Sequence, residues 1–353
     1  MHLAVVILNY NTRELLRQCL RSVLGAAAAC AGQLTVIPLV VDSASSDGSA
    51  AMIAAEYPDV PLLASPENLG YTGGNNLALH RLGFAVEAPL SSLTLPAPLP
   101  KPDYVLLLNA DTTVAPDALG EMVRALEAHP AAGACGARLC YGDGSFQHGA
   151  FRFPSLAQLA LDLFPLATWP GIRRVAARLY DSPINGRYPR AWWEQRTPFA
   201  VDFVLGAALL VRGAAIDQVG GLDDGYFMYC EEMDWCVRLA EAGWQVLAAP
   251  SAQVVHYEGQ SSRQVRWPAY ERLWRSRLRF YAKHAHRYPA GYRWLAWRLI
   301  GLGMAWRAGA AMRRFARGAL TGNEAQAELN AYQAIRALTY AHPSALTQPR
   351  QGR

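Results

Sequence analysis

The stretch Tyr104-Val-Leu-Leu-Leu-Asn-Ala-Asp-Thr-Thr113 decides how the chain folds. Its four apolar residues from Val105 to Leu108 predict a short strand buried on both faces, and Asn109, Ala110 and Asp111 follow at once. In an open α/β sheet, ligands bind beyond the carboxyl ends of such strands. The Asp111 carboxylate is therefore placed to bind a metal or a polyphosphate, or to make a local Asx turn, and the stretch alone allows both.

Two earlier strands are predicted to end in polar residues in the same way. Residues 3–8 form an apolar run that ends in Asn9-Tyr-Asn-Thr12, and residues 35–41 form a second run that ends at Asp42. Helical spacing of apolar residues follows both turns. From the end of its strand, Asp42 is placed to bind a ribose hydroxyl or a base edge, or it only closes a loop together with the polar residues that follow it. The first turn lacks Gly-x-Gly-x-x-Gly, which argues against a dehydrogenase-type dinucleotide site.

Glycines mark two further stretches where the backbone is expected to approach a neighbour closely. Residues 66–76 hold three glycines and three asparagines, and they predict a Gly-rich loop before a helix that runs to about Phe84. Residues 201–211 predict one strand, with Gly206 at its centre. The first pattern lets the backbone pass close to a ligand, and the second indicates a backbone that comes close to a neighbour of unspecified kind.

The second dense group of polar residues lies between Gly220 and Trp235. Trp235, Leu239 and Ala242 share a helical stripe, so Glu231, Glu232 and Asp234 are predicted on the first turn of a helix. One acid would satisfy the helix dipole. Three acids beside aromatic residues suggest that at least one has a raised pKa and transfers a proton.

Composition indicates a globular protein with an uneven distribution of charge. The chain has 353 residues, 52 % of them hydrophobic, which is enough for one large α/β domain with an appendage or for two domains. Residues 263–317 contain fourteen Lys or Arg against one acid, Glu271. The six cysteines include no Cys-x-x-Cys pair, and no signal peptide is recognisable at the start, so we expect reduced cysteines and a cytoplasmic location.

An ordered series of motifs over residues 3 to about 260 resembles the inverting glycosyltransferases of family 2, and its acidic stretch resembles the rhamnosyltransferase-like branch. The motifs are Val5-Val-Ile-Leu-Asn-Tyr-Asn11, Val41-Asp-Ser-Ala-Ser-Ser-Asp-Gly48, Glu67-Asn-Leu-Gly-Tyr-Thr-Gly-Gly-Asn-Asn76, Leu108-Asn-Ala-Asp111, Phe227-Met-Tyr-Cys-Glu-Glu-Met-Asp-Trp235 and Val255-His256. The resemblance implies a GT-A fold, a Rossmann-like and mainly parallel sheet flanked by helices. It implies a catalytic domain over 1–262, with a donor-binding half at about 1–112 and an acceptor-side half at about 113–262.

The resemblance also implies roles for single residues in a metal-assisted transfer of a sugar from a nucleoside-diphosphate donor. Asp111 matches the last position of an Asp-x-Asp motif and would bind Mg²⁺ or Mn²⁺, while Asn109 stands where the family has its first Asp, with Ala110 between them. His256 matches a histidine that completes metal coordination in some relatives; the residues themselves equally allow a structural histidine. The donor site would comprise Asn9, Asn11, Asp42, Asn68, Gly73, Gly74 and Asn75. Glu232 aligns with the catalytic base, Glu231 is the alternative, and Asp234 would orient the acceptor or cap the helix.

Beyond residue 262 the sequence predicts a helical appendage over 263–342 and a disordered tail over 343–353. Residues 294–315 mix Trp and Leu with Arg298 and Arg307, and two arginines inside an apolar run argue against a spanning helix. We expect residues 263–318 to contact an anionic membrane peripherally, on the inner face of the cell membrane. The alternative is a basic helix that packs on the catalytic domain.

The function expected from the resemblance is sugar transfer to a glycan or lipid-linked acceptor in cell-surface polysaccharide synthesis, with rhamnose as one candidate sugar. A sugar nucleotidylyltransferase is disfavoured because its Gly-rich triphosphate loop is absent after the first strand. A non-catalytic carbohydrate-binding or scaffolding protein is favoured only by Glu232 and Asn109 in place of Asp. No nucleic-acid partner is expected, since the basic tail matches no recognised motif.

Overall fold

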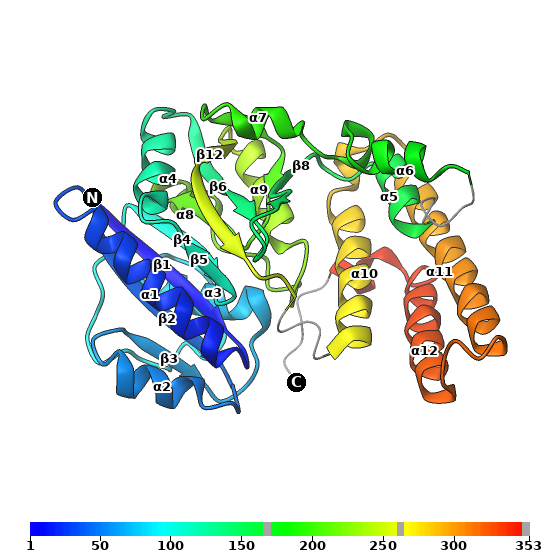
Figure 1. The fold of residues 1–353 in the computed structure, drawn as a ribbon, viewed down its shortest axis with the longest axis horizontal. Helices are drawn as coiled ribbons and strands as arrows, with labels where there is room; N and C mark the ends of the chain where they lie inside the picture. The colour runs from blue at the N-terminus through cyan, green and yellow to red at the C-terminus, as the bar shows by residue number, and fades with distance from the viewer. Residues whose placement is uncertain (165–170, 260–264, 348–353) are drawn as a thin grey trace. The chain divides into compact units, whose positions relative to one another are not determined.

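The computed structural model describes residues 1–164, 171–259 and 265–347 (Figure 1). It divides the chain into two compact units. The first comprises Met1–Arg152, Tyr188–Phe227 and Glu231–Ser261, and the second comprises Phe153–Arg187, Met228–Cys230 and Ser262–Arg353. The expected domain boundary at residue 262 lies outside the described residues, so the functional division of the chain stays a prediction.

The first unit is built on one sheet with the order β3-β2-β1-β4-β11-β6-β12-β5. Strands β3, β2, β1 and β4 run parallel to one another, β12 is parallel to β6, and β11 runs antiparallel between β4 and β6. The strands are β1 (His2–Asn9), β2 (Thr35–Ser43), β3 (Leu62–Ser65), β4 (Tyr104–Asn109), β5 (Thr112–Val114), β6 (Ala132–Cys140), β11 (Ala208–Arg212) and β12 (Gln245–His256). Short strands β7 (Phe146–Gln147) and β9 (Phe199–Val201) extend it at β6 and β12, while β8 (Ala150–Phe151) pairs with β10 (Phe203–Val204).

Helices cover both faces of this sheet, as Figure 1 shows. In β4, Leu106 and Leu108 belong to the main core cluster together with side chains of α1 and α4, while Val105 and Leu107 are fully buried on the opposite face. The predicted strand with two buried faces is therefore confirmed. The helices of this unit are α1 (Arg13–Ala29), α2 (Ser49–Glu56), α3 (Gly70–Arg81), α4 (Ala118–Glu127), α7 (Arg190–Glu194), α8 (Gly213–Val219) and α9 (Glu231–Glu241).

Strand register brings the predicted polar strand ends to one edge of the sheet. Asn9 at the end of β1 is the partner of Asp42 in β2, and Leu8 is the partner of Asn109 in β4. Because the three strands are parallel, their carboxyl ends meet there. The sequence alone identified this edge correctly.

Two local predictions are wrong. Residues 70–76 are the first turns of helix α3 and not a loop. Their small residues are explained by close packing of this helix on its neighbours. Residues 201–211 are not one strand, since β9 ends at Val201, β10 pairs with β8 in a separate two-stranded sheet, and β11 begins at Ala208, after Gly206. In both places a tertiary contact overrides the local pattern.

The second unit is helical and has a core of its own. Its helices are α5 (Leu156–Leu163), α6 (Arg173–Tyr180), η2 (Pro183–Asn185), α10 (Arg266–Lys283), η4 (Ala285–Arg287), α11 (Tyr292–Ala316), α12 (Gly322–Leu338) and α13 (Pro343–Thr347). Trp274, Trp297, Ile300 and Ile335 are among the core residues that α10, α11 and α12 share. The expected disordered tail is wrong for residues 343–347, which form α13 with Leu346 buried, and residues 348–353 lie outside the described part. As expected, none of the six cysteines forms a disulfide.

Candidate functional site

The carboxyl ends of β1 and β2 form a closed hydrogen-bond network. Asn9 Nδ2 donates to Asp42 Oδ1 at 2.7 Å and to Ser45 Oγ at 3.0 Å, and the backbone N–H of Ser45 donates to Asp42 Oδ2 at 3.0 Å. The backbone N–H of Asn11 also donates to Ser45 Oγ, at 2.9 Å, and Asn11 adopts φ 52°. Asn9 and Asp42 are almost fully buried. They therefore shape this edge from within, and their contact with a nucleoside stays a prediction.

The Asn109-Ala110-Asp111 turn is held on both sides by backbone hydrogen bonds. The N–H of Asn109 donates to the carbonyl of Ala207 at 3.1 Å, and the N–H of Tyr257 donates to the carbonyl of Asp111 at 2.9 Å. Ala110 is buried beneath the turn. These bonds pin the turn to the start of β11 and to the end of β12, which come from remote parts of the sequence.

Asp111 lies against His256. His256 Nε2 is 3.4 Å from Asp111 Oδ1, and the pairing of β12 with β5 creates this approach because His256 is the partner of Thr112. Within the described residues, no backbone N–H donates to the Asp111 carboxylate, which argues against the local Asx turn. The structure thus brings the two predicted metal ligands together.

The Gly- and Asn-rich residues lie in helix α3 and just before it, and the helix packs against β1. Gly74 packs so closely on β1 that an added Cβ would lie 2.3 Å from Leu8 Cδ1. Asn75 is buried and its Nδ2 donates to the carbonyl of Tyr71 at 2.9 Å, while Asn68 accepts from the N–H of Gly70 at 2.9 Å. Gly73, by contrast, is partly exposed. Packing thus accounts for Gly74, whereas donor contact of Asn68, Gly73, Gly74 and Asn75 stays a prediction.

The predicted acids stand on the first turn of α9, as expected. Glu232 is mostly buried, and burial raises the pKa of its carboxyl from 4.5 to about 7. The nearby backbone N–H groups of Glu232, Met233 and Gly206 partly oppose the rise in this pKa. Glu231 is buried as well. Asp234 is fully buried and accepts from Arg238 Nε at 2.9 Å. Its expected role in orienting the acceptor or capping the helix stays a prediction.

Gly206 connects this acidic turn to the Asp111 turn. Its carbonyl accepts from the Tyr71 hydroxyl at 2.6 Å, the carbonyl of the next residue, Ala207, accepts from the N–H of Asn109, and its own N–H partly opposes the rise in the pKa of Glu232. Burial, followed by the charges of Glu231 and Glu232, raises the pKa of Tyr71 well above its usual value. The expectation that the backbone at Gly206 meets a close neighbour is confirmed. Sequence reasoning did not identify Tyr71 as that neighbour, although it stands within the Gly-rich motif.

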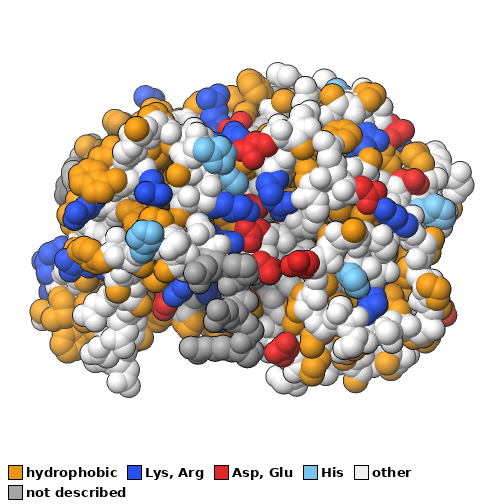
Figure 2. All heavy atoms as spheres, turned by 180° about the vertical axis from the view of Figure 1, so that it is seen from behind, with side chains coloured by type: hydrophobic (Ala, Val, Ile, Leu, Met, Phe, Trp, Pro, Cys, Tyr) orange, Lys and Arg blue, Asp and Glu red, His pale blue; other side chains and the backbone are white. Residues whose placement is uncertain are grey.

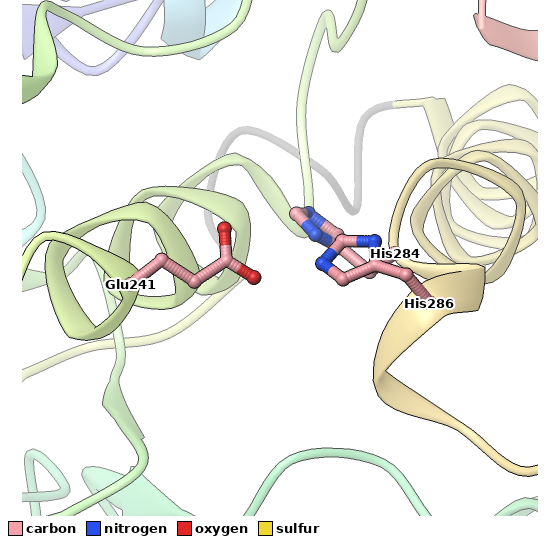
Figure 3. Close-up of side chains that lie close together, drawn as sticks. All are labelled: Glu241, His284 and His286. Atoms are coloured by element: carbon pink, nitrogen blue, oxygen red, sulfur yellow. The ribbon is translucent and has the colours of Figure 1, made fainter.

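Two histidines of the second unit do not add to this site. Figure 3 shows His284, which follows α10, and His286 in η4, with ring centroids 6.0 Å apart. The same view includes Glu241 from the end of α9, which belongs to the first unit. Two imidazoles from one unit do not complete a metal site, so we assign no ligand to them.

Comparisons with known proteins agree on one family. The family model "Glycosyltransferase like family 2" matches residues 2–279. An N-acetylglucosaminyl-diphospho-decaprenol L-rhamnosyltransferase of Mycobacterium tuberculosis (strain H37Rv) is 30% identical over 261 residues, which cover 74% of this chain and 77% of the relative. Rhamnosyltransferase WbbL of Escherichia coli (strain K12) is 36% identical over 83 residues, 24% of this chain and 31% of the relative.

Among solved structures, mannosyltransferase PcManGT from Pyrobaculum calidifontis, in complex with GDP-Man and Mn²⁺, has a TM-score of 0.50. Its sequence identity is 17%, and the match covers 95% of this chain and 86% of that chain. This similarity and the family match confirm the expected GT-A fold.

Proposed function

The chain belongs to glycosyltransferase family 2, and from this premise we propose that it transfers a sugar from a nucleoside-diphosphate donor to a glycan or lipid-linked acceptor with inversion. The M. tuberculosis relative is named for L-rhamnosyl transfer to a decaprenol-linked saccharide. We therefore propose rhamnose as the candidate sugar and a lipid-diphosphate saccharide as the acceptor class. Cell-surface polysaccharide synthesis at the inner face of the membrane is the process that such an acceptor serves.

The raised pKa of the Glu232 carboxyl is the main support for this proposal. A general base is most effective when its pKa lies near the working pH, and burial raises the pKa of this carboxyl to about 7. Glu232 takes the proton of the acceptor hydroxyl while that oxygen attacks the anomeric carbon. The bond from this carbon to the diphosphate oxygen breaks, and the nucleoside diphosphate leaves. Glu231, on the same turn, is the alternative base.

Asp111 and His256 are the residues that would hold a divalent cation. Their carboxylate oxygen and imidazole nitrogen lie 3.4 Å apart, and both are donor atoms that Mn²⁺ and Mg²⁺ accept. Such a cation stabilises the negative charge on a departing diphosphate when it is bound. With Asn109 in place of a second carboxylate, we propose that the donor phosphates complete the coordination. Asn9, Asn11 and Asp42 would surround the nucleoside.

A panel of nucleotide sugars, each with Mn²⁺ or Mg²⁺, tests this function. The correct donor should raise the unfolding temperature, and release of the nucleoside diphosphate should depend on the cation. Asp111→Asn should abolish the cation dependence, whereas Asp117→Asn, an exposed carboxylate before α4, should leave it unchanged. A protein that responds to no donor with either cation would overturn the proposed activity.

We also propose that helix α11 rests on an anionic membrane, because one side of it is both apolar and basic. Five large apolar residues of α11 are exposed although the helix contributes others to the core of its unit: Trp294, Leu295, Leu302, Met312 and Phe315. Arg298 lies over the Trp294 ring, and Arg313 is exposed nearby on the same side. Figure 2 shows Lys and Arg beside hydrophobic side chains on one face of the molecule. Among the described helices, none combines the length and the apolar character that crossing a membrane requires.

Vesicle binding tests this membrane contact. Binding to vesicles with anionic lipid should weaken with salt, since exposed arginines attract the surface. The double variant Arg298→Glu with Arg313→Glu should bind much more weakly than Arg173→Glu with Arg174→Glu, which makes the same change of charge on exposed residues of α6. Equal binding by the two double variants would favour the alternative, in which the helix only packs within the protein.

A further inference from the structure

Two residues that the proposed reaction does not use lie directly behind His256. Gln147 in β7 is buried, its Nε2 donates to Glu258 Oε2 at 3.3 Å, and its Oε1 is 3.2 Å from His256 Nδ1. The side chains therefore form a chain from Glu258 through Gln147 and His256 to Asp111, in which the last separation is 3.4 Å.

The chemistry of these groups fixes the direction of each hydrogen bond. An ionised carboxylate only accepts, so the amide NH₂ of Gln147 must face Glu258, and the carbonyl oxygen of the amide must face His256. A carbonyl oxygen also only accepts, so the proton of the neutral His256 ring must sit on Nδ1. Nε2 then presents a lone pair to the Asp111 carboxylate.

Two acceptor atoms that face each other at 3.4 Å repel unless a positive group lies between them. In the opposite tautomer, with the proton on Nε2, His256 would instead donate to Asp111. Neither Nε2 nor the Asp111 oxygen would then be available to a cation. This tautomer would also leave the Gln147 carbonyl facing the Nδ1 lone pair. The choice of tautomer therefore decides whether this pair is open to a cation or closed by its own hydrogen bond.

We propose that Gln147 and Glu258 are positioning residues that hold His256 as the Nδ1–H tautomer and so keep Nε2 and Asp111 available to a divalent cation. This inference rests on the proposed function, which makes those two residues the ligands. Neither positioning residue touches the cation or the substrate.

The backbone supports this assignment. Leu139 of β6 is the register partner of Gln147 in β7 on one side and of Val254 in β12 on the other, so β7 and β12 flank β6, and the Gln147 side chain reaches His256 from across that strand. Glu258 adopts φ 33°, a region that residues other than glycine rarely enter. Such backbone conformations are concentrated at functional sites.

The tautomer can be measured without donor, acceptor or turnover. Long-range ¹H–¹⁵N spectra of the metal-free full chain, labelled at histidine, distinguish the two tautomers at a pH where the ring is neutral, and the spectrum of His256→Asn assigns the signal. Wild type should show Nδ1–H. Gln147→Leu should shift His256 toward Nε2–H and weaken Mn²⁺ binding by roughly 10–100-fold, the usual effect of losing such a support.

Two further variants separate positioning from folding. Gln253→Leu, the same substitution at an exposed position of β12, should change neither readout. The exchanged pair Gln147→Glu with Glu258→Gln keeps an acceptor toward Nδ1 and an amide donor behind it, so it should restore both the tautomer and the affinity. An unchanged tautomer in Gln147→Leu, or a changed tautomer with unchanged Mn²⁺ affinity, would overturn the inference. Wild type that shows Nδ1–H but binds no Mn²⁺, even with nucleotide sugars present, would overturn the proposed metal site instead.

Discussion

The ionisation of Glu232 is expected to govern both turnover and stability near neutral pH. Burial raises the pKa of its carboxyl from 4.5 to about 7. The perturbation is Glu232→Gln, which keeps the size of the side chain and removes the titration. The two consequences of the raised pKa can then be measured on one variant.

The sign and size of the stability effect follow from proton binding. Because the folded protein holds this proton more tightly than the unfolded chain, stability is favoured at low pH and is lost as the pH rises from about 4.5 through about 7. A rise of this size in the pKa corresponds to about 3 kcal/mol of unfolding free energy, at 1.36 kcal/mol per pH unit. Glutamine stays neutral, so the stability of Glu232→Gln relative to wild type should increase by up to this amount between pH 4 and 8.

Turnover, unlike stability, should increase as the pH rises. Since the base must be ionised, kcat/KM of the wild type should rise with pH and level off above the pKa of Glu232. Glu232→Gln should lack this rise and should be slower by roughly 10²–10⁴-fold, the usual contribution of a general base. Urea unfolding at pH 4–8 and release of nucleoside diphosphate over the same range provide the two measurements.

Two further substitutions serve as references. Glu87→Gln, at an exposed position outside the site, should follow the wild type in both assays. Glu231→Gln distinguishes the two candidate bases. If Glu232→Gln and wild type lose stability in parallel with pH, the raised pKa is refuted, and if Glu232→Gln keeps normal turnover, the base is Glu231.

Three further predictions concern contacts that position the site. Gly206→Ala places a Cβ 2.5 Å from the Tyr71 hydroxyl and should destabilise by about 1–3 kcal/mol in thermal unfolding, whereas Gly25→Ala, which has nothing within 4 Å on helix α1, should stabilise. Asn9→Ala removes the donor to the buried Asp42 Oδ1 and one of two donors to Ser45 Oγ, and it should cost about 1–3 kcal/mol in urea unfolding; a loss below 0.5 kcal/mol, about the least expected of one hydrogen bond, would count against the network. Asp47 accepts from the first backbone N–H of both α1 and α2, so Asp47→Ala should lose about 1–2 kcal/mol, and Asp47→Asn should recover part of it.

Several features of the site could be predicted from the sequence because they depend on local pattern. The apolar run before Asn109 specifies a buried strand, and the apolar stripe from Trp235 onward places Glu231 and Glu232 at a helix start. Parallel strands place their ends at one edge, so Asp42 was expected there as well. None of these predictions depends on which distant residue packs against the strand or the helix.

Local pattern failed where a distant neighbour sets the conformation. Residues 70–76 have the composition of a loop but form a helix, and the glycines are required by close contacts: a Cβ on Gly70 would meet Phe227, and one on Gly74 would meet Leu8. In the same way, the strand predicted over residues 201–211 is interrupted around Gly206, whose carbonyl accepts from the Tyr71 hydroxyl. Propensity carries no information about such partners.

The sequence by itself determined the fold class, the edge of the sheet where the polar strand ends meet, and the position of the acidic helix start. Only the tertiary structure decided that His256 faces Asp111, that Gln147 stands behind His256, and that the pKa of Glu232 is raised to about 7. The physical reason is that a strand end or an amphipathic helix is encoded within a few residues. Burial and hydrogen-bond direction depend instead on atoms brought together from strands more than a hundred residues apart in the chain.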